Sequence, residues 1–152
     1  MAFQLFTQAF QDGGPIPRLH TCEGADLSPT LEWSGEPSAT RSFAVIVDDP
    51  DAPGGVWTHW LLCDIPADVH SLAQGFKSGT VGISGANDFG RPGYGGPCPP
   101  KGHGAHRYYF KVLAVDSPSL GLKAGVRRHD IDRALKGHIL AEAVLMGHYE
   151  RR

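Results

Sequence analysis

The chain has 152 residues, of which 41% are hydrophobic and 20% charged, a balance typical of a single globular domain with one core. Its net charge is −2 and its basic residues are scattered, which argues against a nucleic-acid-binding face. No apolar stretch approaches the length of a transmembrane segment, and the N-terminus lacks the pattern of a signal peptide. We therefore expect one cytoplasmic domain that spans residues 1–152.

The first half of the chain predicts strands separated by tight loops. Residues 12–30 are rich in glycine, proline and polar residues, which indicates an extended loop with short edge strands. Residues 43–47 form a continuous apolar, mainly β-branched run, which predicts a buried strand. This strand leads into the segment Asp49-Pro50-Asp51, followed by a further proline and two glycines, and such a segment predicts a structured turn. Acidic residues in a loop at a strand end are candidates for function.

The next predicted strand covers residues 57–65. Strict alternation places every second side chain on one face, namely Trp57, His59, Leu61, Cys63 and Ile65. A long loop at residues 87–102 then carries five glycines and four prolines. Proline removes much of the backbone freedom of such a loop, so we expect it to be ordered and functional.

The last third of the chain predicts one further strand and a helix. Residues 106–115 alternate clearly, and His106 and Tyr108 begin the face that continues with apolar residues. Apolar residues after Asp130 recur at helical spacing, which predicts a helix from a cap at Asp130 to about Met146, with Gly147 ending it. A late helix appended to a set of strands indicates a sandwich or barrel with a helix over one edge.

The three cysteines, Cys22, Cys63 and Cys98, are an odd number at wide spacings. Because no Cys-x-x-Cys pair is present, we expect free thiols in a reducing compartment, with neither a zinc knuckle nor a redox motif. The histidine spacings H-x-H and H-x-x-x-H are also absent, so no metal site is expected.

Two histidines are the candidates for a binding site. His59 and His106 each start a predicted strand after a glycine- and proline-rich loop, and they share their faces with Trp57 and Tyr108 respectively. If the strands are close, the two rings converge on a small, mostly apolar pocket near the acidic turn 49–51. The alternative to a binding role is that each histidine is a buried core residue whose ring is hydrogen-bonded within the protein.

The remaining reactive residues carry less information. His103 is a candidate for the pocket rim only. Four further histidines are expected at the surface, namely His20, His70, His129 and His148. An acid–base pair of His59 and His106 would suit a hydrolase. However, no Gly-x-Ser-x-Gly motif is present, and Cys98 is interpreted as an ordinary loop residue.

Two segments resemble the signatures of the phosphatidylethanolamine-binding protein family. The first is Asp49-Pro50-Asp51-Ala52-Pro53 followed by Trp57-Thr58-His59-Trp60-Leu61, and the second is residues 95–102 followed by His106-Arg107-Tyr108. Ser28-Pro29 with residues 31–33, and the segment 137–141, are similar to the bacterial and archaeal, Raf-kinase-inhibitor-like branch. The resemblance covers essentially the whole chain.

The resemblance implies a mainly β fold, an antiparallel Greek-key β-sandwich with a C-terminal helix and a few short helical turns. It also implies a small pocket for phosphate-like anions, including the phosphoethanolamine head group. The positions that match the family's pocket are Asp49, Asp51, Pro53, Trp57, His59, Gly96, Pro100, His106 and Tyr108.

Within that pocket we expect both histidines to donate hydrogen bonds to phosphate oxygens. One of Asp49 and Asp51 would hold an imidazole in its donating orientation, and the other would accept a ligand ammonium against the face of Trp57.

The function expected is that of a non-enzymatic binding protein for anionic or phosphorylated head groups, with a regulatory role, no catalytic residues and no cofactor or metal. The alternatives are a hydrolase that uses His59 and His106, and an interaction protein that inhibits a kinase or protease through the loop 87–102. The resemblance implies a homodimer, and a protein target is left open.

Overall fold

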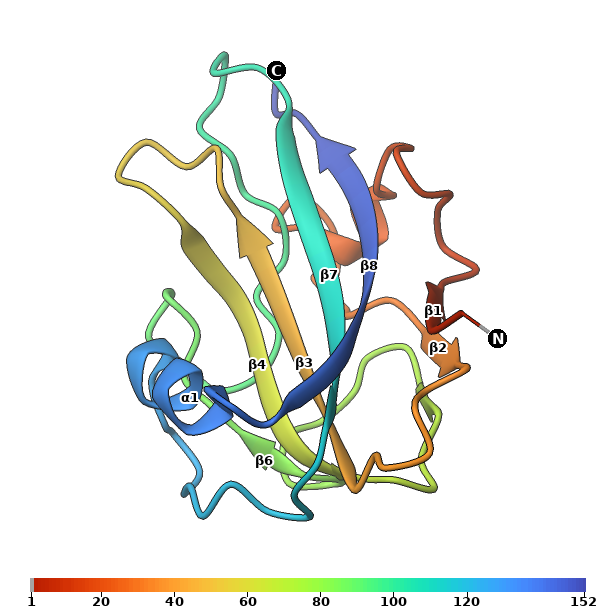
Figure 1. The fold of residues 1–152 in the computed structure, drawn as a ribbon. Helices are drawn as coiled ribbons and strands as arrows, with labels where there is room; N and C mark the ends of the chain where they lie inside the picture. Colours follow the sequence, from red (N-terminus) through yellow and green to blue (C-terminus); the bar gives the residue numbers. More distant parts are fainter. Residues whose placement is uncertain (1) are drawn as a thin grey trace.

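The computed structural model describes residues 2–152 and contains two antiparallel β-sheets (Figure 1). The five-stranded sheet has the order β6-β4-β3-β7-β8, so β7 lies beside β3 rather than beside β6, which precedes it in sequence. Its strands are β3 (Ser42–Asp49), β4 (Trp57–Pro66), β6 (Ile83–Ser84), β7 (His106–Val115) and β8 (Ile139–Tyr149). The three-stranded sheet has the order β1-β2-β5, with β1 (Gln4–Phe6), β2 (Leu31–Ser34) and β5 (Ser71–Leu72). The predicted mainly β sandwich is confirmed.

Strand β3 is buried on both faces, which explains why its residues 43–47 are apolar without interruption. Phe43, Val45 and Val47 pack into the core between the two sheets. Ala44 and Ile46 pack into a second core beneath the helix α1 (Arg128–Leu135). The buried strand predicted over residues 43–47 is confirmed, and a sheet covered on both faces provides a rigid base for the loops at its ends.

Strand β4 does not keep the strict alternation predicted for it. Asp48 lies opposite Thr58 and Val47 lies opposite Trp60, so His59 is the extra residue of a β-bulge. Beyond the bulge the faces are exchanged, and Leu61 packs under α1 while Trp60 packs between the sheets. The prediction that His59 shares a face with Leu61 and Cys63 is therefore wrong.

The helix predicted from Asp130 to Met146 is also wrong. Helix α1 begins at Arg128, with Asp130 in its first turn, and ends at Leu135. Gly137, with φ 84°, lies between this helix and β8. Residues 139–149 form β8, which pairs with β7 along nearly its whole length (Figure 1). The apolar residues of this segment fit both a helical and a strand period, and the long pairing with β7 decides between them.

The N-terminal segment 12–30 is mainly loop, with the short 3₁₀ helix η1 (Arg18–His20). His20 is buried, and its Nδ1 lies 2.8 Å from the carbonyl oxygen of Leu27, so its predicted surface position is wrong. Cys22 forms a disulfide with Cys98 across a sequence separation of 76, and Cys63 is a buried free thiol. The prediction of three free thiols is therefore wrong for two of them.

The disulfide gives a prediction for stability. Replacing both Cys22 and Cys98 by Ser should lower the free energy of unfolding by about 4 kcal/mol, because the bond closes a long loop in the unfolded chain. Urea unfolding of the oxidised wild type and the double variant measures this difference. Cys63→Ala is the matched control, since it removes a thiol without removing a crosslink. Equal stability of the double variant and the wild type would contradict the prediction.

Candidate functional site

A cavity of about 170 Å³ opens at the end of the five-stranded sheet where β3 ends and β4 and β7 begin. In Figure 1 the loop after β3 and the loop before β7 lie at this same end of the sheet. The cavity wall is mostly aromatic and proline side chains around a few polar groups: Asp49, Ala52, Pro53, Trp57, His59, Phe89, Cys98, Pro99, Pro100, His106 and Tyr108. The structure therefore brings His59, His106 and Asp49 together, as the sequence predicted.

Two of the nine predicted pocket residues, Asp51 and Gly96, do not line this cavity. The Asp51 carboxylate accepts hydrogen bonds from the backbone N–H of Arg107 at 2.9 Å and from its guanidinium at 2.8 Å. These contacts lower the pKa of Asp51 to about 2 and direct the carboxylate toward Arg107. The N–H of Gly96 donates to Asp26, and a Cβ at Gly96 would lie 2.2 Å from the carbonyl oxygen of His20. Gly96 is thus needed where two loops pack closely.

Four residues line the cavity without having been predicted: Ala52, Phe89, Cys98 and Pro99. Ala52 and Pro99 stand inside the two signature segments, so their position beside predicted residues was an available signal. Phe89 has no such signal in the sequence. Its ring packs edge-on against both Trp57 and His59, each with centroids 5.4 Å apart.

His106 forms a buried pair with Asp49. Its Nδ1–H donates to Oδ2 of Asp49 at 2.7 Å, and both side chains are almost fully buried. The other carboxylate oxygen accepts the backbone N–H of Asp51 at 2.8 Å. Of the two acids considered for orienting an imidazole, Asp49 is the one in place. Because a carboxylate can only accept a hydrogen bond, the hydrogen lies on Nδ1, and this bond fixes the tautomer and the ring orientation of His106.

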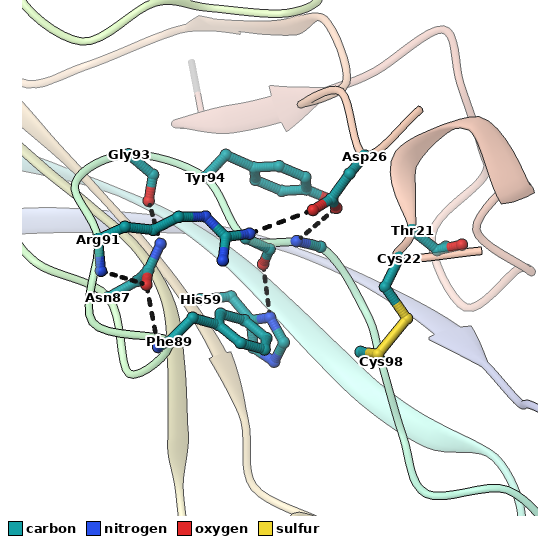
Figure 2. A network of polar contacts seen from close by, with 12 residues as sticks. Thr21, Cys22, Asp26, His59, Asn87, Phe89, Arg91, Gly93, Tyr94 and Cys98 are labelled. Carbon is teal, nitrogen blue, oxygen red and sulfur yellow. Dashed lines mark hydrogen bonds and ion pairs between the residues drawn. A yellow bond between two sulfur atoms is a disulfide. The ribbon is translucent and has the colours of Figure 1, made fainter. Parts of the chain in front are cut away.

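His59 is held differently. Its Nδ1–H donates to the carbonyl oxygen of Gly95 at 2.6 Å (Figure 2). The N–H of Gly95 in turn donates to the carbonyl oxygen of His59. Burial lowers the pKa of His59, so the neutral ring is favoured. The neutral ring carries its hydrogen on Nδ1 and a lone pair on Nε2. His59 therefore offers a ligand an acceptor, whereas the sequence predicted a donor.

The Tyr108 hydroxyl is the other notable polar group of the wall. Its oxygen is buried and has no hydrogen-bond partner among the described residues. Burial, and then the charge of Asp49, raise the pKa of Tyr108 well above its usual range, so the hydroxyl keeps its proton. Most buried polar groups in proteins are hydrogen-bonded, so a hydroxyl without a hydrogen bond of ordinary geometry in a cavity wall is available to a ligand as a donor.

A network of polar contacts holds two segments of the wall (Figure 2). The Asn87 side chain accepts the N–H of Phe89 at 3.0 Å and donates to the carbonyl oxygen of Gly93 at 2.9 Å. Asp26 binds the N–H of Gly96, and the adjoining Cys98 is fixed by its disulfide. The loop 87–102 is therefore ordered, as its proline content predicted.

The chemistry of the cavity is limited to few groups. One carboxylate, two imidazoles and one phenol line it, and none of its lining residues is a lysine, arginine, serine or threonine. Within residues 2–152, no cluster of three or more histidine, cysteine or acidic residues could hold a metal ion. Over the same residues, no helix is long and apolar enough to cross a membrane.

A family model described as phosphatidylethanolamine-binding protein matches residues 6–150. The chain belongs to this family. It is 48% identical to a UPF0098 protein of Aquifex aeolicus over 97% of this chain and 88% of that protein. Another UPF0098 protein, from Methanothermobacter thermautotrophicus, is 45% identical over 97% of this chain and 98% of its own length.

Solved structures of phosphatidylethanolamine-binding protein relatives have the same fold. The crystal structure of Escherichia coli YbcL, described as a member of this family, is 37% identical and superposes with a TM-score of 0.93, with 100% of both chains covered. The family homologue CT736 of Chlamydia trachomatis is 39% identical, with a TM-score of 0.90 and 99% of both chains covered.

The state of His59 can be measured directly. We expect its ring to stay neutral, with the hydrogen on Nδ1, from pH 8 down to 6.5, because burial lowers its pKa. Two-dimensional ¹⁵N–¹H spectra of the imidazoles as a function of pH report the tautomer, and His59→Gln assigns the signal. A His59 ring that gains its second proton above pH 6.5 would contradict this prediction.

Proposed function

We propose that this member of the phosphatidylethanolamine-binding protein family binds a small phosphorylated group that also carries a cation, of the phosphoethanolamine type. The observation that carries the proposal is the buried Asp49–His106 pair beside the unpartnered hydroxyl of Tyr108, in the wall of one small cavity. The family description supports the same class of ligand.

The anionic part of the ligand is assigned to His106 and Tyr108. Asp49 occupies Nδ1 of His106, so Nε2, which lies 2.7 Å from Nδ1 of His103, is the ring nitrogen that a ligand would have to reach, and it donates when the ring is protonated. The Tyr108 hydroxyl keeps its proton and has no partner, so it is a second donor. Hydrogen bonds from such donors to phosphate oxygens are charge-assisted and short.

The cationic part of the ligand is assigned to groups that accept hydrogen bonds or carry negative charge. The lone pair of His59 Nε2 and the negative charge of Asp49 both attract an ammonium. The rings of Trp57 and Phe89 offer faces for a cation–π contact of about 0.5–2 kcal/mol. Asp51, which the sequence made a candidate ammonium acceptor, is instead paired with Arg107.

The cavity supports binding better than hydrolysis. A neutral His59 could act as the base and a protonated His106 as the acid of an acid–base pair, but no serine, threonine or lysine lines the cavity as a nucleophile. The one cysteine in the wall, Cys98, is bonded to Cys22 and cannot attack a substrate. A regulatory role through a kinase or another protein target stays a proposal, as does a homodimer.

We propose a cytoplasmic location, on the condition that the disulfide is stable in that compartment. Disulfides are rare in reducing cytoplasm outside hyperthermophiles. The Cys22–Cys98 bond would persist there only with a reduction potential below that of the thiol pool.

Replacing His106 tests the anionic half. His106→Ala should weaken phosphoethanolamine binding by about 1.5–3 kcal/mol, the range for a hydrogen bond to a charged group. Isothermal titration calorimetry at fixed pH measures the change. His129→Ala, an exposed histidine of α1 outside this cavity, is the control and should bind like the wild type. Undiminished binding by His106→Ala would remove His106 from the site.

Comparing ligands tests the cationic half. Phosphoethanolamine should bind more tightly than inorganic phosphate to the wild type, and Asp49→Asn should reduce that preference. The same calorimetry measures all four dissociation constants, with ethanolamine as the control for the cation alone. Equal affinities of the wild type for the two phosphates would leave the ammonium without a role.

A further inference from the structure

We propose that His103 is a displaceable plug that competes with the ligand's anionic group for Nε2 of His106 and thereby sets the affinity of the site. This inference rests on the proposed function, because it concerns the same cavity. His103 stands just outside the group of residues that line the cavity, and neither the family description nor the names of the relatives assign it a role.

The geometry leaves His106 without a free nitrogen. Its Nδ1 is bonded to Asp49 at 2.7 Å, and its Nε2 lies 2.7 Å from Nδ1 of His103. Two nitrogens at this distance share one hydrogen, so that hydrogen is committed to the pair whichever ring carries it. A phosphate oxygen can reach a hydrogen on His106 Nε2 only after the His103 ring has moved away.

His103 is the partner that is free to move. Its side chain is exposed, whereas His106 is buried on β7 and fixed by Asp49. Gly102 and Gly104, on either side of it, have φ values of 75° and 92°, and a Cβ on either would meet open space. Glycines in this conformation give the segment backbone freedom that other residues lack. Displacing His103 therefore costs less than displacing His106.

Few contacts hold His103 in place. Its N–H donates to the carbonyl oxygen of Pro100 at 3.1 Å, and its ring packs edge-on against His106 with centroids 4.9 Å apart. The backbone contact does not fix the ring, since the side chain can leave by rotation about its own bonds. The ring contact and the nitrogen pair are thus what a ligand has to replace.

Replacing His103 should change the affinity for the ligand in the direction opposite to replacing His106. Removing a competing hydrogen bond of ordinary strength should tighten binding about 2- to 10-fold, because the ligand no longer has to break it. His103→Ala should therefore lower the dissociation constant for phosphoethanolamine and for inorganic phosphate by this factor. His103→Asn, which keeps a side-chain N–H donor near the position of Nδ1, should remain closer to the wild type.

Calorimetry with these two probes at one pH tests the proposal. Lys101→Ala removes an exposed charge from the same loop and is the matched control for general effects on charge and loop flexibility. Imidazole ¹⁵N spectra provide a second readout: in the wild type, ligand should shift the signals of both His106 Nε2 and His103 Nδ1. In His103→Ala, the His106 signal should already be altered without ligand.

The outcomes separate this inference from the proposed function. Unchanged affinity in His103→Ala, with binding still dependent on His106, overturns the plug and leaves the proposed function standing. Weaker binding in His103→Ala also overturns it, since His103 would then be a donor to the ligand. If neither the wild type nor any variant binds either probe and no histidine signal shifts, the proposed function fails and the plug fails with it.

Discussion

The site depends on a carboxylate that is buried beside an imidazole at the end of a sheet. A buried charge is costly unless every lone pair and proton around it is matched. Asp49 accepts two such hydrogen bonds, one from the Nδ1–H of His106 and one from the backbone N–H of Asp51. The first contact ties the end of β3 to the start of β7, and the second fixes the turn that follows β3. The cavity lies beside the end of β3, the turn after it and the start of β7, which these two hydrogen bonds hold together.

The neighbouring acid shows how the same turn is held from the other side of the sheet. Asp48 precedes Asp49 on β3, and alternation directs it to the opposite face. There its buried carboxylate accepts hydrogen bonds from the guanidinium of Arg128 on α1, with Lys111 of β7 3.7 Å away. The Arg128 guanidinium also contacts the hydroxyl of Thr58, which lies opposite Asp48 on β4. Two adjacent acids therefore anchor one strand end to the cavity wall on one face and to the helix on the other.

The sequence could predict the parts of this arrangement that are local in the chain. The apolar run of β3, the alternation of β7 and the proline-rich segment 97–100 each carry their own signal. The bulge at His59 carries none, because it arises from how β4 pairs with β3. The Cys22–Cys98 bond and the position of Phe89 likewise depend on which loops meet in space. The spacing of apolar residues in the segment that forms β8 fits a helix as well as a strand, and only its pairing with β7 decides between them.

The proline content of the cavity wall limits the ways in which it could bind the anion proposed above. Many phosphate sites use successive backbone N–H groups or a helix N-terminus as donors. Pro53, Pro99 and Pro100 have no N–H, and the Pro99 carbonyl oxygen is already bonded to the side chain of Arg151 at 2.7 Å. In the anion site proposed above, these three prolines would offer no backbone donor, and the side chains of the wall carry no permanent positive charge. A ligand that brings its own cation would neutralise Asp49 while its phosphate meets His106 and Tyr108. A zwitterion thus suits this wall better than a bare multiply charged anion does.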